Sequence, residues 1–480
     1  MKKIALALVF LLAVGAVFAK GEKEAAGPVK LVWWTIGGAP KDLPLVLTEL
    51  NAYLKEKINV ELEIKYSDWG EYTEKLSKII NTGEEYDICF TCSWANPFVK
   101  NAANGAFYAI DDLLKTEATD LNKFIPSMLW DSAKVNGKIY AVPTYKDTAF
   151  APYWALNKND LTALGLNSAD FEWHKGETSV DSMKRLEKGF AAYKKANPTK
   201  YPFQQQKEGW TGLFDEFDMI AVPVGVDYND KSAKAVFPLE SKVLQDKWDL
   251  LCAWNKAGYI NPDAATLQEN LKVVFVFGGH GFPYADVAFW SGNFPCEAVL
   301  RMEPFFTTGS AQGSMNAISA HSKHPKHALK LLELVNRDPK VRNLLAFGIE
   351  GKHYKKTGDN SIEFIDKKSY DVPSFAQGTF FTMYTVDPAP PQMWKAVQDF
   401  NKSVRASPIL GFSFDPTPVE TELSVLSAEW KKYDALIRLG LKTRAEIYDE
   451  MVKNLNKAGL QTVIAEVQRQ IDAWKKSSGR

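Results

Sequence analysis

The sequence predicts an α/β protein of two lobes that are joined by hinge strands and extended by an α-helical C-terminal region. Three features of the 480 residues predict this fold. Residues 28–116 alternate between strand and helix periodicity, 135–143 and 145–156 are two extended segments in series, and the chain from about 417 is nearly all helical in pattern. Alternating strands and helices imply right-handed crossovers and a mainly parallel sheet.

The first lobe is expected over residues 28–146, with a returning segment at about 305–320. Its strands are expected at 29–34, 60–66 and 86–91, and its helices at 42–57, 70–81 and 95–104. Ligands of parallel α/β sheets sit beyond the carboxyl ends of the strands. We therefore expect the ligand near 35–38, 67–69 and 92–96.

The second lobe is expected over residues 147–304, together with about 321–416. Its helices are expected at 180–196, 210–220, 242–257 and 325–337, with β-rich runs at 273–277 and 282–290, and the extended segment at 305–319 is the part that returns to the first lobe. The C-terminal extension, 417–480, should form helices at 419–439, 443–458 and 460–474. Segments that cross between lobes more than once suit a hinged protein that closes on a ligand.

Charge and motifs exclude several functions. Lys plus Arg and Asp plus Glu number 58 each, so we expect neither nucleic acid nor an anionic membrane as a partner. The three histidines at 321, 324 and 327 are interpreted as a solvated helix start, and the glycines at 278–281 lack the Lys-Ser/Thr of a phosphate loop. We expect no catalytic residue, no metal and no cofactor.

The N-terminus predicts export. A basic start at Lys2 and Lys3 precedes an uncharged stretch, so 1–19 is interpreted as a signal peptide, with an uncleaved anchor as the alternative. We expect a periplasmic or cell-surface protein. The first cysteine is Cys89, so no lipobox cysteine is found, and retention at the membrane stays open. A disulfide among the four cysteines is possible, with open connectivity.

Several motifs together resemble the family-1 extracellular solute-binding proteins of ABC importers. They are LVWW at 31–34, YSDWGEY at 66–72, FTCSWAN at 90–96, VNGKIYAVP at 135–143 and SKHPKHA at 322–328. FGIEGKHY at 347–354 and GFSFD at 411–415 resemble a subgroup with an extra C-terminal domain of unassigned role. The resemblance implies a type II periplasmic-binding fold, a sugar or oligosaccharide in the cleft, delivery to the permease subunits of an ABC transporter, and a monomer.

The candidate ligand-binding residues are rings and polar groups near the predicted strand ends and the hinge. A sugar needs planar aromatics for its C–H faces and polar side chains for its hydroxyls. The candidates are Trp34, Ser93, Trp94, Asn96, Tyr145, Lys146, Asp147, Trp154, Trp210 and Trp290. For each tryptophan the alternative is a core position, for Asn96 a helix cap, and for Lys146 and Asp147 a surface charge pair.

Three functions remain open from the sequence. A non-enzymatic receptor for a sugar is the leading interpretation. An exported carbohydrate-active enzyme would have a similar aromatic composition, which is 12% Phe, Trp and Tyr. A binding protein for a peptide or another non-sugar solute is the third.

Overall fold

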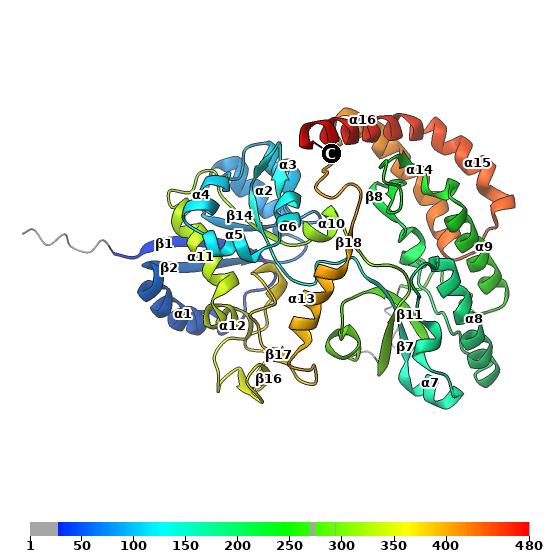
Figure 1. The fold of residues 1–480 in the computed structure, drawn as a ribbon, viewed down its shortest axis with the longest axis horizontal. Coiled ribbons are helices and arrows are strands. Elements are labelled where there is room, and N and C mark those ends of the chain that lie inside the picture. Colours follow the sequence, from blue (N-terminus) through cyan, green and yellow to red (C-terminus); the bar gives the residue numbers. More distant parts are fainter. Residues whose placement is uncertain (1–26, 269–273, 293, 480) are drawn as a thin grey trace, which may run out of the picture.

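The computed structural model describes residues 27–268, 274–292 and 294–479, and it shows two lobes (Figure 1). The predicted signal peptide, 1–19, lies outside the described residues. Within the described ranges, no helix is both long enough and apolar enough to span a bilayer.

The first lobe is built on a five-stranded sheet with the order β2-β1-β3-β14-β6. The strands are β1 (Val29–Ile36), β2 (Val60–Ser67), β3 (Ile88–Thr91), β6 (Ala141–Pro143) and β14 (Met315–Ile318). Strands β2 and β3 both pair in parallel with β1, as the crossover argument predicts, and β14 runs antiparallel between β3 and β6. The returning segment near 305–320 therefore contributes a central strand to this sheet.

Helices cover this sheet on both sides in Figure 1. They are α1 (Leu43–Ile58), α2 (Tyr72–Thr82), α3 (Phe98–Ala103), α4 (Asp111–Thr116), α5 (Thr119–Phe124), α6 (Ser127–Ser132), α11 (Pro325–Arg337) and α12 (Pro339–Phe347). Buried side chains of α11 and α12, such as Leu329 and Leu345, share one core with Leu31 of β1. The expectation that 321–416 belongs to the second lobe needs correction here, because the apolar faces of these two helices pack on the first sheet.

The second lobe contains two antiparallel three-stranded sheets, in the orders β11-β7-β12 and β10-β9-β8. Its strands are β7 (Pro152–Asn157), β8 (Phe217–Ala221), β9 (Val224–Asp227), β10 (Ala235–Val236), β11 (Val276–His280) and β12 (Cys296–Leu300), and its main helices are α7 (Lys158–Leu164), α8 (Ser179–Ala196) and α9 (Lys242–Lys256).

Two predicted elements of this lobe are wrong. The helix predicted at 210–220 is a short 3₁₀ turn followed by strand β8, because the apolar run pairs with β9 through a tight hairpin. The β-rich run predicted at 282–290 instead ends in a single π-helical turn, Asp286–Trp290. Short apolar runs do not distinguish strand from helix by periodicity alone.

Three segments connect the lobes. The first runs from β6 to β7, the second from β12 to β14, and the third follows α13 (Met393–Ser403). In the second and third segments, strands β13 (Phe305–Phe306) and β18 (Arg405–Ala406) pair in parallel. A small sheet of β15 (Tyr354–Lys356), β16 (Ser361–Phe364) and β17 (Thr385–Val386) lies below the first lobe in Figure 1.

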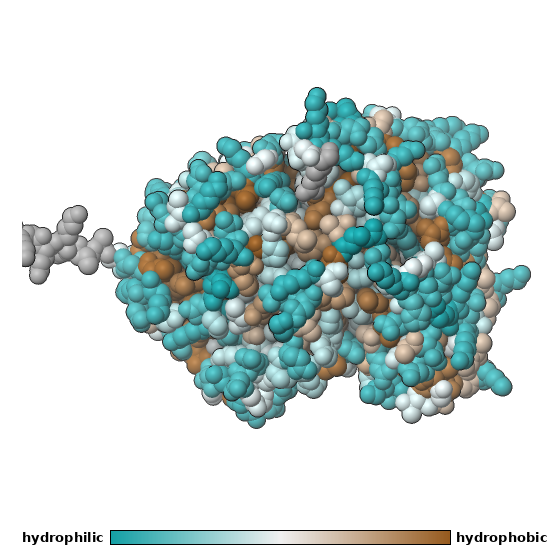
Figure 2. Space-filling model, viewed as in Figure 1, coloured by the Kyte–Doolittle hydropathy of each residue, from teal (hydrophilic) through white to brown (hydrophobic). Residues whose placement is uncertain are grey.

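The C-terminal extension packs on the second lobe. Its helices are α14 (Glu420–Arg438), α15 (Arg444–Lys457) and α16 (Leu460–Ser478), close to the predicted ranges. Leu426 and Trp430 of α14 lie in the same hydrophobic core as Trp248 and Leu251 of α9. In Figure 2 the outer side of these helices, along the top and right, is mostly hydrophilic. The extension is therefore part of the second lobe's core, not a separately packed body.

Gly440→Ala tests this packing. Gly440 follows α14 at φ +62°, and a Cβ there would lie 2.3 Å from the backbone carbon and oxygen of Leu251. Backbone atoms cannot move aside as a flexible side chain can, so we expect a loss of about 1–3 kcal/mol in the free energy of unfolding, measured in urea. Gly165→Ala is the matched control, because its φ is +63° with nothing within 4 Å. Equal losses in the two variants would contradict the close-packing argument.

Candidate functional site

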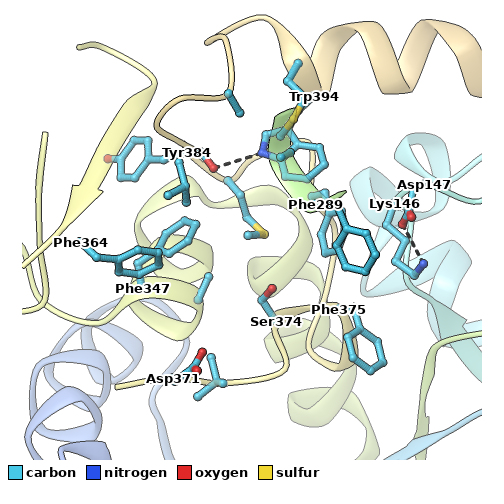
Figure 3. Close-up of a pocket in the computed structure, with 18 of the residues that line it drawn as sticks. Lys146, Asp147, Phe289, Phe347, Phe364, Asp371, Ser374, Phe375, Tyr384 and Trp394 are labelled. Carbon is cyan, nitrogen blue, oxygen red and sulfur yellow. Dashed lines mark hydrogen bonds and ion pairs between the residues drawn. The ribbon is translucent and has the colours of Figure 1, made fainter. Parts of the chain in front are cut away.

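A cavity of about 460 Å³ lies between the lobes. Aromatic side chains from both lobes line it, including Phe347, Phe364, Phe375, Tyr384 and Trp394 from the first and Phe282 and Phe289 from the second (Figure 3). Lys146 and Asp147, from the first crossing segment, lie at its edge. This volume is in the range of small-molecule sites, which combine apolar walls with a few polar groups.

Lys146 and Asp147 form an ion pair at the hinge. Lys146 Nζ lies 2.8 Å from Asp147 Oδ1, and the side chains are 17% and 25% exposed. Asn401 of α13 fixes the same segment, because its side-chain amide donates to Lys146 O (2.6 Å) and accepts from Ala149 N (3.2 Å). The donor and the acceptor are thus held side by side where the chain passes from one lobe to the other.

The segment 374–379 carries Phe375 to the cavity and is fastened from two sides. Arg342 of α12 donates three hydrogen bonds to it, at Ser374 O, Thr379 O and the side chain of Gln377. Asn316 of β14 donates to the carbonyls of Ala376 and Gln377. Phe375 therefore has a position fixed by the first lobe, although no strand or long helix contains it.

Phe289 is the most exposed aromatic of the second lobe's cavity wall, at 69%. Its neighbour Trp290 is buried and packs edge-on against Tyr153 and Phe277. A Cβ on Gly281 would lie 2.7 Å from the Trp290 ring, so the glycine permits this close packing. Trp290 anchors the turn, and Phe289 projects from it into the cavity in Figure 3.

Three rings of the first lobe form an aromatic platform, defined as Trp69, Trp94 and Phe375. Trp69 and Trp94 are 53% and 52% exposed, and their ring centroids lie 6.1 Å apart at an interplanar angle of 17°. The Phe375 ring lies 6.0 Å from Trp69 and 6.4 Å from Trp94. Trp94 Nε1 donates to Gly313 O at 3.0 Å, which fixes its ring. Trp69 and Trp94 follow the carboxyl ends of β2 and β3, where the sheet rule predicts a ligand.

Of the remaining candidate ligand-binding residues of the first lobe, one is exposed and three are buried. Ser93 is exposed beside Trp94. Trp34 is 7% exposed and packs in the core, and Asn96 is 1% exposed, with its side chain bonded to Phe90 O and to Asn101. Tyr145 is buried against Phe381 at 4.6 Å between ring centroids. The structure therefore supports a core position for Trp34, Asn96 and Tyr145, and their contact with a ligand stays a prediction.

The three tryptophans predicted for the second lobe are buried. Trp154 and Trp210 are stacked at 5.7 Å, with the guanidinium of Arg301 5.1 and 5.2 Å from their rings, and Trp290 is 4% exposed. None of the three lines the cavity, so their role as ligand contacts also stays a prediction. The sequence interpretation missed every aromatic residue that lines the cavity, Phe375 and Phe289 among them, and it also missed Trp69 of the platform. Trp69 could have been predicted, because it lies at the strand end 67–69, where a ligand is expected.

The cysteines are free thiols. Burial raises the pKa of Cys89 to about 12 and that of Cys92 to about 11, so both are protonated at neutral pH. Cys252 and Cys296 are also unpaired, which leaves no disulfide among the four. In the part of the chain that the structure describes, no group of three or more His, Cys, Asp or Glu side chains could hold a metal ion.

Similar proteins agree with this architecture. The chain is 27% identical over 464 residues to a Streptococcus pneumoniae protein described as a carbohydrate ABC transporter substrate-binding protein, covering 92% of this chain and 90% of that one. A crystal structure of the N-glycan transport solute-binding protein NgtS from the same species has a TM-score of 0.83 at 25% identity, covering 94% of this chain and 100% of that one. NgtS in complex with Man5GlcNAc has a TM-score of 0.67 at 26% identity, covering 94% and 99%.

Two family models match the chain. A domain of unknown function, DUF3502, matches residues 408–476, which confirms the predicted C-terminal addition. The model described as bacterial extracellular solute-binding protein matches residues 50–348, more than half of the chain. The predicted two-lobe binding-protein fold is confirmed, and the chain belongs to the bacterial extracellular solute-binding proteins.

Proposed function

We propose that this protein is the substrate-binding component of an ABC transporter and that it captures a sugar or oligosaccharide between its lobes. The observation that carries the proposal is the interlobe cavity, which rings from both lobes line and which has the Lys146–Asp147 pair at its edge. Rings offer flat faces to the C–H faces of a sugar, and the ammonium and carboxylate offer a donor and an acceptor to its hydroxyls. The relatives named for carbohydrate and N-glycan transport support the same cargo class.

Binding is proposed to close the lobes. The same relative, NgtS, has a TM-score of 0.83 to this structure in one crystal structure and 0.67 in its complex with Man5GlcNAc. A different lobe arrangement in the sugar complex would produce such a difference. Contacts that form only in the closed arrangement shift the equilibrium toward it, and the closed form would dock on the permease.

The other parts of the proposal follow from this role. The protein acts as a non-enzymatic, exported monomer in the periplasm or at the cell surface, with the membrane-spanning permease subunits as partners. The family description, extracellular, supports the export. Recovery of an unaltered oligosaccharide after incubation is the expected result, measured by mass spectrometry. A shortened sugar would instead favour a carbohydrate-active enzyme.

Phe289→Ala tests the role of the cavity. We expect calorimetry to show binding of Man5GlcNAc to the wild-type protein and about 3- to 10-fold weaker binding to the variant, because one ring face is lost. X-ray scattering should show a smaller radius of gyration for the wild-type protein with sugar. Val425→Ala is the control, since Val425 is 53% exposed on α14 and is not among the residues that line the cavity. Equal affinities for all three proteins, or no compaction, would contradict the proposal.

A further inference from the structure

The aromatic platform extends beyond the cavity. Phe375 lines the cavity, whereas Trp69 and Trp94 do not. Phe375 nevertheless lies within stacking distance of both indoles, at 6.0 and 6.4 Å between ring centroids. The rings therefore form one continuous aromatic surface that begins in the cavity and continues outside it.

The two indoles are exposed in an ordered arrangement. Trp33 and Trp34 are 1% and 7% exposed on the same sheet, so the lobe buries large rings where it can. Trp69 and Trp94 keep more than half of their surface in water, although exposed apolar surface costs free energy and a cluster of it marks a binding site. The hydrogen bond from Trp94 to Gly313 holds its ring before any ligand arrives. Preorganised rings lower the entropy cost of binding.

The charges that line the cavity are balanced. The four charged residues that line the cavity are Lys146, Asp147, Lys367 and Asp371. Lys146 lies 2.8 Å from Asp147, and Lys367 lies 4.0 Å from Asp371, so each cation has an anion beside it. Beside the platform, the exposed side chains of Asp68 and Ser93 neighbour Trp69 and Trp94 in sequence and can meet hydroxyl groups. Nothing in this set favours an acidic sugar over a neutral one.

We propose that the aromatic platform is a second sugar subsite, continuous with the cavity through Phe375, and that together they bind a neutral oligosaccharide that spans both. The inference rests on the proposed function and deepens it. A short sugar fills the cavity alone and does not reach Trp69 and Trp94. Selection for chain length thus resides in the two indoles, and the cavity supplies the affinity common to short and long ligands.

The test compares two sugar lengths in two variants. The probes are Man5GlcNAc and the smaller Man1GlcNAc, both ligands of NgtS. For the double variant Trp69→Ala/Trp94→Ala, we expect calorimetry to show about 5- to 100-fold weaker binding of Man5GlcNAc and less than about 2-fold change for Man1GlcNAc. Phe289→Ala should weaken binding of both sugars by a similar factor. The single variant Trp69→Ala leaves the Trp94–Gly313 hydrogen bond intact. It should also lose affinity for Man5GlcNAc and not for Man1GlcNAc, but by a smaller factor than the double variant.

Each contrary result has a distinct meaning. Unchanged affinity of the double variant for Man5GlcNAc, or equal losses for both sugars, overturns the subsite. Unchanged affinity of the double variant for Man5GlcNAc together with reduced uptake of the sugar by cells would indicate that the platform contacts the permease. This result would also overturn the proposed subsite. If the folded wild-type protein binds neither of these sugars nor any other in a panel of neutral oligosaccharides, the proposed function fails, and the subsite fails with it.

Discussion

Replacing Arg342 by alanine is expected to lower the free energy of unfolding by about 3–5 kcal/mol. The Arg342 side chain is fully buried on α12. Its Nε donates to Thr379 O at 2.6 Å, Nη1 to Gln377 Oε1 at 3.0 Å and Nη2 to Ser374 O at 2.7 Å. The alanine variant leaves a cavity and removes the donors of three buried acceptors, and each of these changes is destabilising.

The charge of Arg342 adds to this effect. Burial lowers the pKa of its guanidinium to about 9, so the group is still cationic at pH 7. Charged donors form stronger hydrogen bonds than neutral donors do. Lysine at this position keeps a charge but cannot present three donors in a planar fork. Arg342→Lys should therefore recover only part of the loss.

Urea unfolding at pH 7 measures the prediction, with Lys340→Ala on the same helix as the control. Lys340 is exposed, and its ammonium lies 4.5 Å from the Tyr53 ring centroid. Its replacement by alanine should lower the free energy of unfolding by less than about 1 kcal/mol. Arg342 also positions the segment that carries Phe375, so Man5GlcNAc should bind the folded variant more weakly. A loss below 1 kcal/mol for Arg342→Ala would show that other contacts hold the segment 374–379.

Local periodicity predicted those parts of the fold that depend on local sequence. The helix expected at 42–57 is α1, Leu43–Ile58, and the helices expected at 443–458 and 460–474 are α15 and α16. Trp94 lies exposed at the edge where the strand-end rule predicts it, because parallel strands place their carboxyl ends at one edge, and its contact with a ligand stays a prediction. The assignment of α11 to the wrong lobe shows the limit, since the periodicity of an apolar helix face does not indicate which core the face packs in.

The rest of the site depends on contacts between distant segments. Phe375 reaches the cavity because Arg342 and Asn316 hold its segment, and no pattern in the sequence near 375 indicates those bonds. Trp290 and Phe289 are adjacent, yet one is buried and the other exposed, and Gly281, just after β11, leaves the space that the Trp290 ring occupies. A sequence pattern indicates which rings could meet a ligand, and long-range packing decides which of them do.

Asp218→Asn is expected to remove a pH dependence of stability between pH 3.8 and about 6. Asp218, in β8, is buried, and its Oδ2 accepts a hydrogen bond from the hydroxyl of Ser407 at 2.6 Å. Burial raises the pKa of this carboxyl from its ordinary value of 3.8 to about 6, and the Ser407 bond opposes the rise only in part. The contact joins the second lobe to the chain that follows β18, the last crossing strand.

The direction in which stability changes with pH follows from the number of protons that each state binds. Between pH 3.8 and about 6 the folded protein keeps the Asp218 proton while the unfolded chain loses it, so the folded state binds more protons. Stability from this group is fully present below pH 3.8 and is lost as pH rises through about 6. Over the whole window the loss amounts to about 3 kcal/mol. Asparagine does not titrate, so the free energy of unfolding of the variant does not decrease with pH through this group.

Urea unfolding of both proteins at several pH values from 3.5 to 7.5 measures the effect. We expect the stability of Asp218→Asn relative to the wild type to increase by up to about 3 kcal/mol across this range. Ser407→Ala is the matched variant, because it removes the bond that lowers the pKa of Asp218 and should move the upper limit of the window to higher pH. A difference between wild type and Asp218→Asn that stays constant with pH would mean that folding leaves the pKa of Asp218 at its ordinary value of 3.8. The cost of its burial would then be offset by the Ser407 bond, and above pH 3.8 a charged hydrogen bond would join the second lobe to the segment that follows β18.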